Sequence, residues 1–307
     1  MKILITGANG TIGSDLVNFF SNCAQNNKVI AFYRTPNFVS KNLRNKNVRW
    51  VKQDLRKKIL YRIYPKILIH CVVAHPFSKK NTYLNYLDSN ITALKNVIEF
   101  AKEKKIEKFF YLSSFKIYGD TSKISKNCNT FTNPDILGAT KILSEKMLEL
   151  QKFNYLNIRM PGVLTYYLKD KRRPWLNNII NKLKKNQIVN IYNSETLFNN
   201  IVDTYEIFKF VNYLIKKKSM KKGTLNFSVN KPIKVKSMIY DLKKKLSSKS
   251  KIILKKKKTK RLIIFPNQAT SDYGFNIAST TEIDNRYVEN YASFSLIDNC
   301  GKYQYEL

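Results

Sequence analysis

The sequence predicts an α/β protein built on a doubly wound parallel sheet, with a smaller C-terminal part. Short apolar runs alternate with longer amphipathic stretches over the first two-thirds of the 307 residues. A glycine-rich turn, Thr6–Gly13, stands between the first apolar run and the first amphipathic stretch. Because such alternation favours parallel strands joined by right-handed crossovers, these observations together predict helices on both faces of a parallel sheet.

The individual elements follow from hydrophobic periodicity. Short apolar runs predict strands over residues 2–6, 28–33, 48–52, 66–73, 108–113 and 155–160. Apolar residues three and four positions apart predict helices at Ile12–Cys23, Asn90–Lys104 and Leu137–Gln151, and further on at 174–186, 204–218 and 235–246. The lysine run Lys255–Lys258 is expected in an exposed loop.

The glycine turn reads Thr-Gly-Ala-Asn-Gly-Thr-Ile-Gly. Gly7 permits a tight turn, Gly10 lets the backbone approach a pyrophosphate, and Gly13 lets the helix pack closely on the strand. The anion would lie at the helix N-terminus, on unpaired backbone N–H groups. A turn of this kind between strand and helix predicts a Rossmann-type dinucleotide site, whose expected contacts are Gly7, Asn9, Gly10, Thr11, Ile12 and Gly13.

The end of the second expected strand bears on which dinucleotide binds. In NAD-binding proteins a carboxylate about 20 residues beyond the glycines accepts a hydrogen bond from the ribose 2′-hydroxyl. Here Tyr33 is followed by Arg34. An arginine can pair with a 2′-phosphate and stack on adenine, so the sequence favours NADP over NAD, with a solvated arginine as the alternative interpretation.

The formal net charge of +35 comes from 56 Lys and Arg against 21 Asp and Glu. It is concentrated at residues 205–261, whose net charge is +18, while residues 262–307 have a net charge of −4. The 43% of hydrophobic residues excludes a fully disordered basic protein. Since the lysine runs lack interleaved aromatic residues and almost lack arginine, nucleic-acid binding is not expected.

Composition also bears on location. The apolar runs are too short to span a membrane, and the chain opens on a strand-like segment that leaves no room for a signal peptide. Four widely spaced cysteines without a C-x-x-C pair suit reduced thiols and predict no metal cluster: Cys23, Cys71, Cys128 and Cys300. We therefore expect a cytoplasmic protein without a metal.

Further motifs follow the glycine turn in a recognisable order. They are Asp54-Leu55, Ile69-His70, Asn90, Leu112–Gly119, Gly138–Glu145, Ile158–Val163 and Asn200–Asp203. Over roughly residues 1–245 this order resembles the extended short-chain dehydrogenase/reductases, and in particular the NAD-dependent epimerase/dehydratase family, whose members mostly process nucleotide-linked sugars. The resemblance implies that Asp54 and Leu55 also contact the dinucleotide.

The resemblance also implies an active site formed by the fifth strand and the next helix. Family members carry there a Ser or Thr and a Tyr-x-x-x-Lys pair. Ser114 occupies the Ser/Thr position, and Lys141 occupies the Lys position, where it would bond the nicotinamide ribose. The Tyr position, which supplies the general acid/base, holds Leu137. Leucine cannot ionise or donate a hydrogen bond.

Three interpretations of Leu137 are open. Another residue moves the proton, with Tyr118, Tyr166, Tyr167 and Lys116 as candidates. Alternatively, Ser114 and Lys141 act with a bound water. In the third interpretation the chain is a catalytically silent dinucleotide-binding scaffold or sensor.

Two positions after Ser114 narrow the expected activity. Family dehydratases carry an Asp-Glu pair there, whereas this chain carries Phe115 and Lys116, so a 4,6-dehydratase is not expected. The leading expectation is a NAD(P)-dependent epimerase or keto-sugar reductase that acts on a nucleotide-activated sugar.

The substrate is expected to contact the C-terminal part. Arg172 and Arg173 stand beside an aromatic residue at a helix entrance and suit a nucleotide diphosphate, with an exposed basic loop as the alternative. We expect a dinucleotide-binding domain over residues 1–160 and a smaller substrate-binding region over residues 161–307, interleaved with the sheet edge. The family commonly dimerises through two helices, which implies a homodimer through Asn90–Lys104 and Leu137–Gln151.

Overall fold

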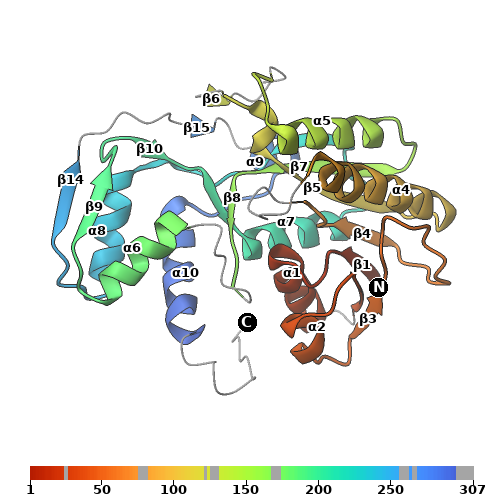
Figure 1. Cartoon of the computed structure of the whole chain (residues 1–307), viewed down its shortest axis with the longest axis horizontal. Helices are drawn as coiled ribbons and strands as arrows, with labels where there is room; N and C mark the ends of the chain where they lie inside the picture. Colours follow the sequence, from red (N-terminus) through yellow and green to blue (C-terminus); the bar gives the residue numbers. More distant parts are fainter. Residues whose placement is uncertain are drawn as a thin grey trace.

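The computed structural model describes residues 1–23, 27–74, 82–120, 123–124, 131–166, 174–255, 263–264 and 268–294. Its centre is a seven-stranded parallel sheet with helices on both faces, which confirms the predicted fold class (Figure 1). The strand order is β12-β7-β5-β4-β1-β2-β3. The direction of winding reverses between β1 and β4, and open parallel sheets bind ligands beyond the carboxyl ends of the strands at such a point.

All six predicted strands are present in this sheet. They are β1 (Lys2–Thr6), β2 (Lys28–Tyr33), β3 (Val48–Lys52), β4 (Ile67–His70), β5 (Lys108–Ser114) and β7 (Asn154–Met160). The predicted strand 66–73 is too long, since the chain leaves the sheet after His70. The seventh strand, β12 (Gly223–Asn226), pairs in parallel with β7 and was not predicted, because Gly-Thr-Leu-Asn has neither an apolar run nor alternation.

Alternate residues of the strands fill two apolar cores, one on each face of the sheet. Ile3 and Ile5 belong to the core that contains α1 (Thr11–Asn22) and α7 (Thr204–Lys216). Leu4 belongs to the opposite core, with α4 (Ala93–Glu103) and the end of α5 (Ile136–Glu149). These four helices correspond to predicted ones, with ends that differ by a few residues.

The predicted helix Asn90–Lys104 does not begin as an α-helix. Its first residues form a π-helical segment, η1 (Leu87–Thr92), which continues directly from the short α3 (Tyr83–Tyr86). Wider turns of this kind are rare and occur frequently at functional sites. Asn90, which lies in η1, is buried and reaches α5 by donating to the hydroxyl of Thr140 at 2.9 Å.

The C-terminal part lies beside the sheet, at the left of Figure 1. It contains α6 (Pro174–Lys184), α8 (Val235–Lys245) and α10 (Thr280–Phe294), with the paired strands β9 (Val189–Tyr192) and β14 (Ile252–Lys255), β8 (Gly162–Leu164) and β11 (Ile201–Asp203), and β10 (Leu197–Phe198) and β13 (Ile233–Lys234). The remaining short elements are α2 (Phe38–Asn42), η2 (Phe115–Tyr118), β6 (Lys123–Ile124), β15 (Ile263–Ile264) and α9 (Gln268–Tyr273).

One basic segment differs from the prediction. Lys255 is not in a loop, because it ends β14 and pairs in parallel with Tyr192 of β9. Residues 256–258 lie outside the described residues. Within the described part of the chain, no helix is both long enough and apolar enough to cross a membrane.

Candidate functional site

The glycine turn connects β1 to α1 at the carboxyl edge of the sheet. Gly7 has a φ of 67°, in the left-handed region that favours glycine. A Cβ built on Gly13 would lie 2.2 Å from the carbonyl oxygen of Gly7, so only glycine fits there. Gly10 precedes α1 and supplies no side-chain cap, and the first turn of the helix carries no acidic residue. The first N–H groups of α1 thus have no side-chain acceptor from their own cap, as an anion site at a helix N-terminus requires.

A cavity of about 1080 Å³ extends from this turn across the carboxyl ends of the strands. It is lined by the segments that follow β1, β2, β3, β4, β5 and β7, and by the side of α5 that faces the sheet. The predicted cofactor residues contribute to this lining: Gly7, Asn9, Gly10, Thr11, Ile12, Gly13, Arg34, Asp54, Leu55 and Lys141. The structure therefore brings together residues that are up to 134 positions apart in the sequence.

Asn9 joins the glycine turn to the loop after β2. Its side-chain amide donates to the carbonyl oxygen of Thr35 at 2.7 Å, while the side chain of Asn37 donates to the carbonyl oxygen of Asn9 at 2.8 Å. The Asn9 side chain is therefore occupied in positioning the loop. The same two hydrogen bonds hold Arg34, which is exposed, at the rim of the cavity.

The carboxylate of Asp54 lies at the same rim and is paired with a cation. Nη2 of Arg56 donates to Oδ2 of Asp54 at 2.6 Å. This hydrogen bond is the main reason that the pKa of Asp54 is lowered, and Arg34 adds a smaller electrostatic contribution. Arg34, Arg56 and Asp54 together carry a net positive charge. Such a group of charges suits an additional phosphate.

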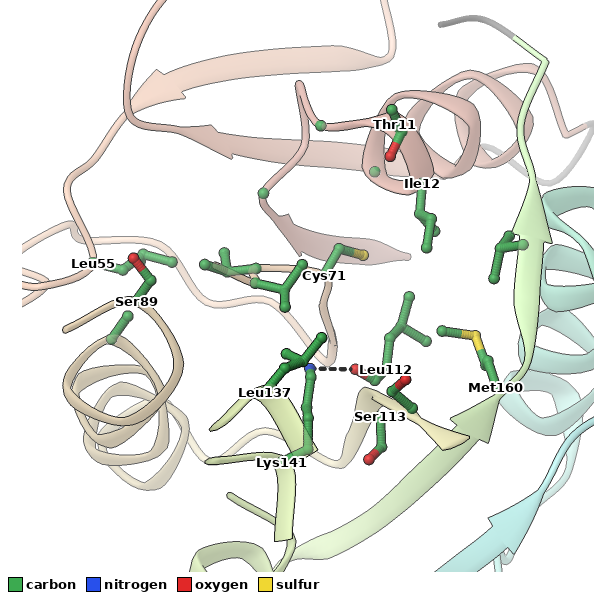
Figure 2. Close-up of a pocket in the computed structure, with 18 of the residues that line it drawn as sticks. Thr11, Ile12, Leu55, Cys71, Ser89, Leu112, Ser113, Leu137, Lys141 and Met160 are labelled. Atoms are coloured by element: carbon green, nitrogen blue, oxygen red, sulfur yellow. Dashed lines mark hydrogen bonds between the residues drawn. The ribbon is translucent and has the colours of Figure 1, made fainter. Parts of the chain in front are cut away.

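Lys141 enters the cavity from α5 and is buried, with 3% of its surface exposed. Its ammonium donates to the carbonyl oxygen of Leu112 at 2.8 Å (Figure 2). The ammonium also lies 4.4 Å from the ring centre of Tyr111. Burial lowers its pKa from 10.5 to about 8. An ammonium with this pKa is still charged at neutral pH.

His70 is part of the core beneath Lys141 and not a general base. Its Nδ1 lies 2.8 Å from the hydroxyl of Thr6, and its ring stacks on Tyr111. Burial, together with the charge of Lys141, lowers the pKa of His70 to about 3, so the imidazole is neutral at physiological pH. His75, the other histidine, lies outside the described residues.

Ser114 ends β5 and is half-buried in the lining of the cavity. Its Oγ accepts a hydrogen bond from the backbone N–H of Lys116 at 3.2 Å and thereby caps η2. The hydroxyl hydrogen is not used in that bond. Ser114 can therefore donate to an oxygen atom in the cavity.

Leu137 fills the position next to Lys141 on α5 with an apolar side chain. It is 5% exposed and packs with Ala74 and Tyr86, while one side of it lines the cavity (Figure 2). The buried residues that surround this leucine form a small apolar cluster. No acid/base group is contributed from this position.

Two of the four residues suggested as substitutes for the missing tyrosine are committed elsewhere. The hydroxyl of Tyr118, which is 1% exposed, donates to Asn226 at 2.6 Å and accepts from Arg159 at 2.9 Å. The hydroxyl of Tyr166 donates to Asp203. Neither tyrosine lines the cavity, and these two interpretations are wrong because burial within the core, which the sequence alone does not show, satisfies both hydroxyls.

The other two suggested substitutes differ in outcome. Tyr167 lies outside the described residues. Lys116 lines the cavity, and its ammonium forms an ion pair with Oδ2 of Asp135 at 3.2 Å. Sequence reasoning did not single out Asp135, and its position at the start of a helix, two residues before Leu137, is the signal that was available.

A buried ion pair anchors the helix that carries Lys141. The guanidinium of Arg159 donates to both carboxylate oxygens of Glu145, from Nε to Oε1 at 3.2 Å and from Nη2 to Oε2 at 2.7 Å. The hydroxyl of Ser113 donates to Oε1 of the same carboxylate at 2.5 Å. Because Glu145 lies four residues after Lys141, both side chains are on the same face of α5. Sequence reasoning included Glu145 and Arg159 in motifs but did not identify their pairing.

Two predictions about ligands remain open. Arg172 and Arg173, the expected contacts of a nucleotide diphosphate, lie outside the described residues. Among the residues that the structure describes, no group of three or more His, Cys, Asp or Glu side chains is placed to hold a metal ion.

Comparison with known proteins gives consistent matches. The model of the NAD dependent epimerase/dehydratase family matches residues 3–222. Protein CapI of Staphylococcus aureus is 24% identical over 242 residues, which cover 71% of this chain and 70% of CapI. The uncharacterized UDP-glucose epimerase YtcB of Bacillus subtilis is 30% identical over 169 residues, which cover 50% of this chain and 53% of YtcB.

The fold is shared with solved structures. The crystal structure of the Bordetella bronchiseptica enzyme WbmG in complex with NAD and UDP matches with a TM-score of 0.79 and 14% identity, covering 96% of each chain. At this identity the likeness shows a common fold. What WbmG binds is a property of that enzyme.

Proposed function

The chain belongs to the NAD-dependent epimerase/dehydratase family, and we propose that it is a NAD(P)-dependent enzyme that epimerises or reduces a nucleotide-activated sugar. One observation carries this proposal. The glycine turn, Ser114 and the buried ammonium of Lys141 line one cavity, although they come from three different elements. A chain that had lost its ligands would have little reason to retain a costly buried charge at this place.

The residues of the cavity fit a dinucleotide. The uncapped N-terminus of α1 suits a pyrophosphate, and a Cβ on Gly10 would fill the space that phosphates approach. A bound dinucleotide supplies the group that takes up and returns a hydride. Lys141 would donate to the ribose hydroxyls in place of its present acceptor, Leu112. Arg34, and the pairing of the Asp54 carboxylate with Arg56, support NADP as the preferred form, whereas WbmG was solved with NAD.

The substrate side of the proposal rests on position in the cavity. Ser114 would donate its hydroxyl hydrogen to the reacting oxygen of the sugar. Residues 161–307 would hold the nucleotide, with Arg172 and Arg173 paired to its diphosphate, and residues 1–160 would hold the dinucleotide. Free thiols at Cys23 and Cys71 agree with the expected cytoplasmic location.

We also propose a homodimer that forms through α5 and the helical segment before α4. Large apolar side chains are exposed on these neighbouring elements, and α5 contacts both α3 and η1. They include Tyr83 at 63%, Leu87 at 42% and Leu143 at 47% exposure. Exposed apolar side chains that gather on adjacent helices mark an interaction surface.

A second candidate function is a catalytically silent dinucleotide-binding scaffold or sensor. The observation that favours it is the burial of Leu137 against Ala74 and Tyr86, which leaves no acid/base at the tyrosine position. In both functions the dinucleotide binds. The two differ in whether a nucleotide sugar is converted.

Binding is tested by isothermal titration of the purified chain with NADPH, NADH and UDP-glucose. We expect both dinucleotides to bind, NADPH more tightly, and Lys141→Met to weaken both without loss of the folded state. Lys146→Met is the matched control, since Lys146 is an exposed lysine on the same helix, paired with Glu149. If neither NADPH nor NADH binds, both candidate functions are contradicted.

A further inference from the structure

We propose that Lys116, oriented by Asp135, is the catalytic acid and base of this chain and replaces the tyrosine whose position Leu137 occupies. This inference rests on the proposed function. Lys116 lies two residues after Ser114, and Asp135 lies two residues before Leu137. The fold brings the two charged side chains together as an ion pair in the lining of the cavity.

Backbone packing fixes where the lysine stands. A Cβ built on Gly138 would lie 2.3 Å from the carbonyl oxygen of Lys116. The η2 helix that contains Lys116 thus rests directly on the first turn of α5, at the residue next to Leu137. The side chain of Lys116 therefore begins close to Leu137, the position at which the family carries its tyrosine.

Asp135 fixes the direction of the lysine side chain. It is the N-cap of α5, and its Oδ1 accepts a hydrogen bond from the N–H of Gly138 at 2.9 Å. Its other oxygen, Oδ2, accepts the ion pair from Lys116 at 3.2 Å. Because one carboxylate both caps the helix and holds the ammonium, the lysine is tied to the helix that carries Lys141. Both members of the pair line the cavity.

Four other groups among the described residues are poorly suited to proton transfer. His70 is buried with a pKa of about 3, and burial raises the pKa of the Cys71 thiol to about 12. Tyr118 and Tyr166 have their hydroxyls bonded within the core. By contrast, the side chains of Lys116 and Asp135 are 59% and 44% exposed, so both are accessible to water and to a substrate in the cavity.

The proton balance is simple in the direction of reduction. The carbonyl carbon of the sugar takes a hydride from the reduced nicotinamide dinucleotide, and the carbonyl oxygen takes one proton from Nζ of Lys116. One C–H bond and one O–H bond form, and the lysine becomes a neutral amine. Water then returns a proton to Nζ, beside the carboxylate of Asp135. In the direction of oxidation, Nζ of Lys116 would first give a proton to water. As the neutral amine it would then take the hydroxyl proton while the hydride of the sugar C–H bond passes to the oxidised dinucleotide.

The first test compares single-turnover rates of UDP-glucose oxidation, followed as reduced dinucleotide at 340 nm. General acid/base catalysis contributes about 10²–10⁴-fold, so Lys116→Met should slow the reaction by at least about 100-fold while dinucleotide affinity is unchanged. Lys146→Met removes an exposed, ion-paired lysine of α5 and should leave the rate unchanged.

A rescue experiment tests the exchange of roles. Adding Leu137→Tyr to Lys116→Met supplies the family's hydroxyl at its usual position and should recover at least about 10-fold of the lost rate, since either group can move the proton. Leu137→Phe has nearly the same size without the hydroxyl and should recover none. Equal rates for Lys116→Met combined with Leu137→Tyr and for Lys116→Met combined with Leu137→Phe would contradict the proposal that Lys116 replaces the tyrosine.

A second readout does not depend on turnover. Acetylation of the wild type, mapped lysine by lysine with mass spectrometry, should show Lys116 protected when NAD and UDP-glucose are both bound, while Lys146 reacts at an unchanged rate. A chain that binds both ligands without protecting Lys116, or that turns over normally as Lys116→Met, would overturn the inference while leaving the proposed function intact. A wild type that binds both ligands and converts none would overturn it as well.

Discussion

Lys141 is the residue whose chemistry differs most from that of the other lysines. Water stabilises an exposed ammonium, whereas a buried ammonium loses this hydration. The loss of hydration lowers the pKa of Lys141 to about 8. The charge has one backbone acceptor and the face of a tyrosine ring as partners. A dinucleotide with ribose hydroxyls would add partners, so we expect binding to stabilise the charged form.

The lowered pKa predicts a pH dependence of stability. Between about pH 8, the folded value, and pH 10.5, the unfolded value, the unfolded chain binds the additional proton, so stability contributed by Lys141 rises with pH. At 1.36 kcal/mol per unit, the free energy of unfolding of the wild type minus that of Lys141→Met should rise by roughly 3 kcal/mol across this window. Urea titrations at pH 7 and pH 10 measure the difference.

The control for this prediction is Lys146→Met, whose difference from the wild type should stay nearly constant between the same two pH values. Parallel pH profiles for the wild type and Lys141→Met would show that the ammonium of Lys141 is not buried as described.

The resemblance of the sequence motifs to the family assigned roles to Ser114 and Lys141 and identified Leu137 at the tyrosine position. It could not decide among the candidate proton donors, because their fate depends on tertiary contacts. Tyr118 and Tyr166 were candidates beside Lys116, and the structure shows that their hydroxyls form hydrogen bonds in the core. The partner of Lys116 lies 19 positions away and is brought to it only by the packing of η2 on α5.

The glycine turn and α1 form the element on which cofactor binding depends. Gly10 and Gly13 both line the cavity, but they differ in how closely the backbone approaches them. A Cβ on Gly10 would lie 3.1 Å from the carbonyl oxygen of Gly7, a contact that small shifts relieve, whereas the 2.2 Å contact at Gly13 requires the backbone to move.

We therefore expect two alanine variants to separate folding from binding. Gly13→Ala should lower the free energy of unfolding by about 1–3 kcal/mol, as overpacking does. Gly10→Ala should keep most of its stability and weaken dinucleotide binding by roughly 10-fold, or about 1.4 kcal/mol. Denaturant titration and calorimetry on the same two proteins measure both quantities, and similar losses of stability in the two variants would contradict the assignment.

Elements with strong periodicity were predictable, and short ones were not. The six main strands were predicted because short apolar runs alternate with longer amphipathic stretches in this part of the chain. The pairs β8–β11 and β9–β14 contain only three or four residues per strand, and their stability comes from neighbours distant in the sequence. The π-helical start of the helix at Asn90 is also a tertiary effect, since its side chain bonds to Thr140 of α5 and to the N–H of Ala74.

The exposed apolar side chains of the proposed dimer surface and the lysine-rich stretch belong to different elements. The lysine-rich stretch 205–261 includes α8 and β14 of the C-terminal part, whereas the exposed apolar side chains of α3, η1 and α5 lie on the sheet domain. Positive potential of this size favours the approach of anionic ligands such as dinucleotides and nucleotide sugars.

The apolar surface predicts the state of assembly. Sedimentation velocity should give a dimer for the wild type, because the exposed side chains of η1 and α5 are buried when two copies associate. The double variant Leu87→Glu and Leu143→Glu should be a monomer. Leu254→Glu, at a leucine of β14 that is 51% exposed, should remain a dimer. A monomeric wild type would contradict the proposed assembly.

The most direct test of the account is conversion of nucleotide sugars by the wild type, observed by NMR at the sugar C4. Purified protein is incubated with NAD or NADP and with UDP-glucose, UDP-glucuronic acid and UDP-N-acetylglucosamine in turn. We expect dinucleotide-dependent conversion of at least one of them by the wild type, despite Leu137. Binding of dinucleotide and sugar without conversion by the wild type, together with conversion by Leu137→Tyr, would contradict it and identify the chain as a silent scaffold.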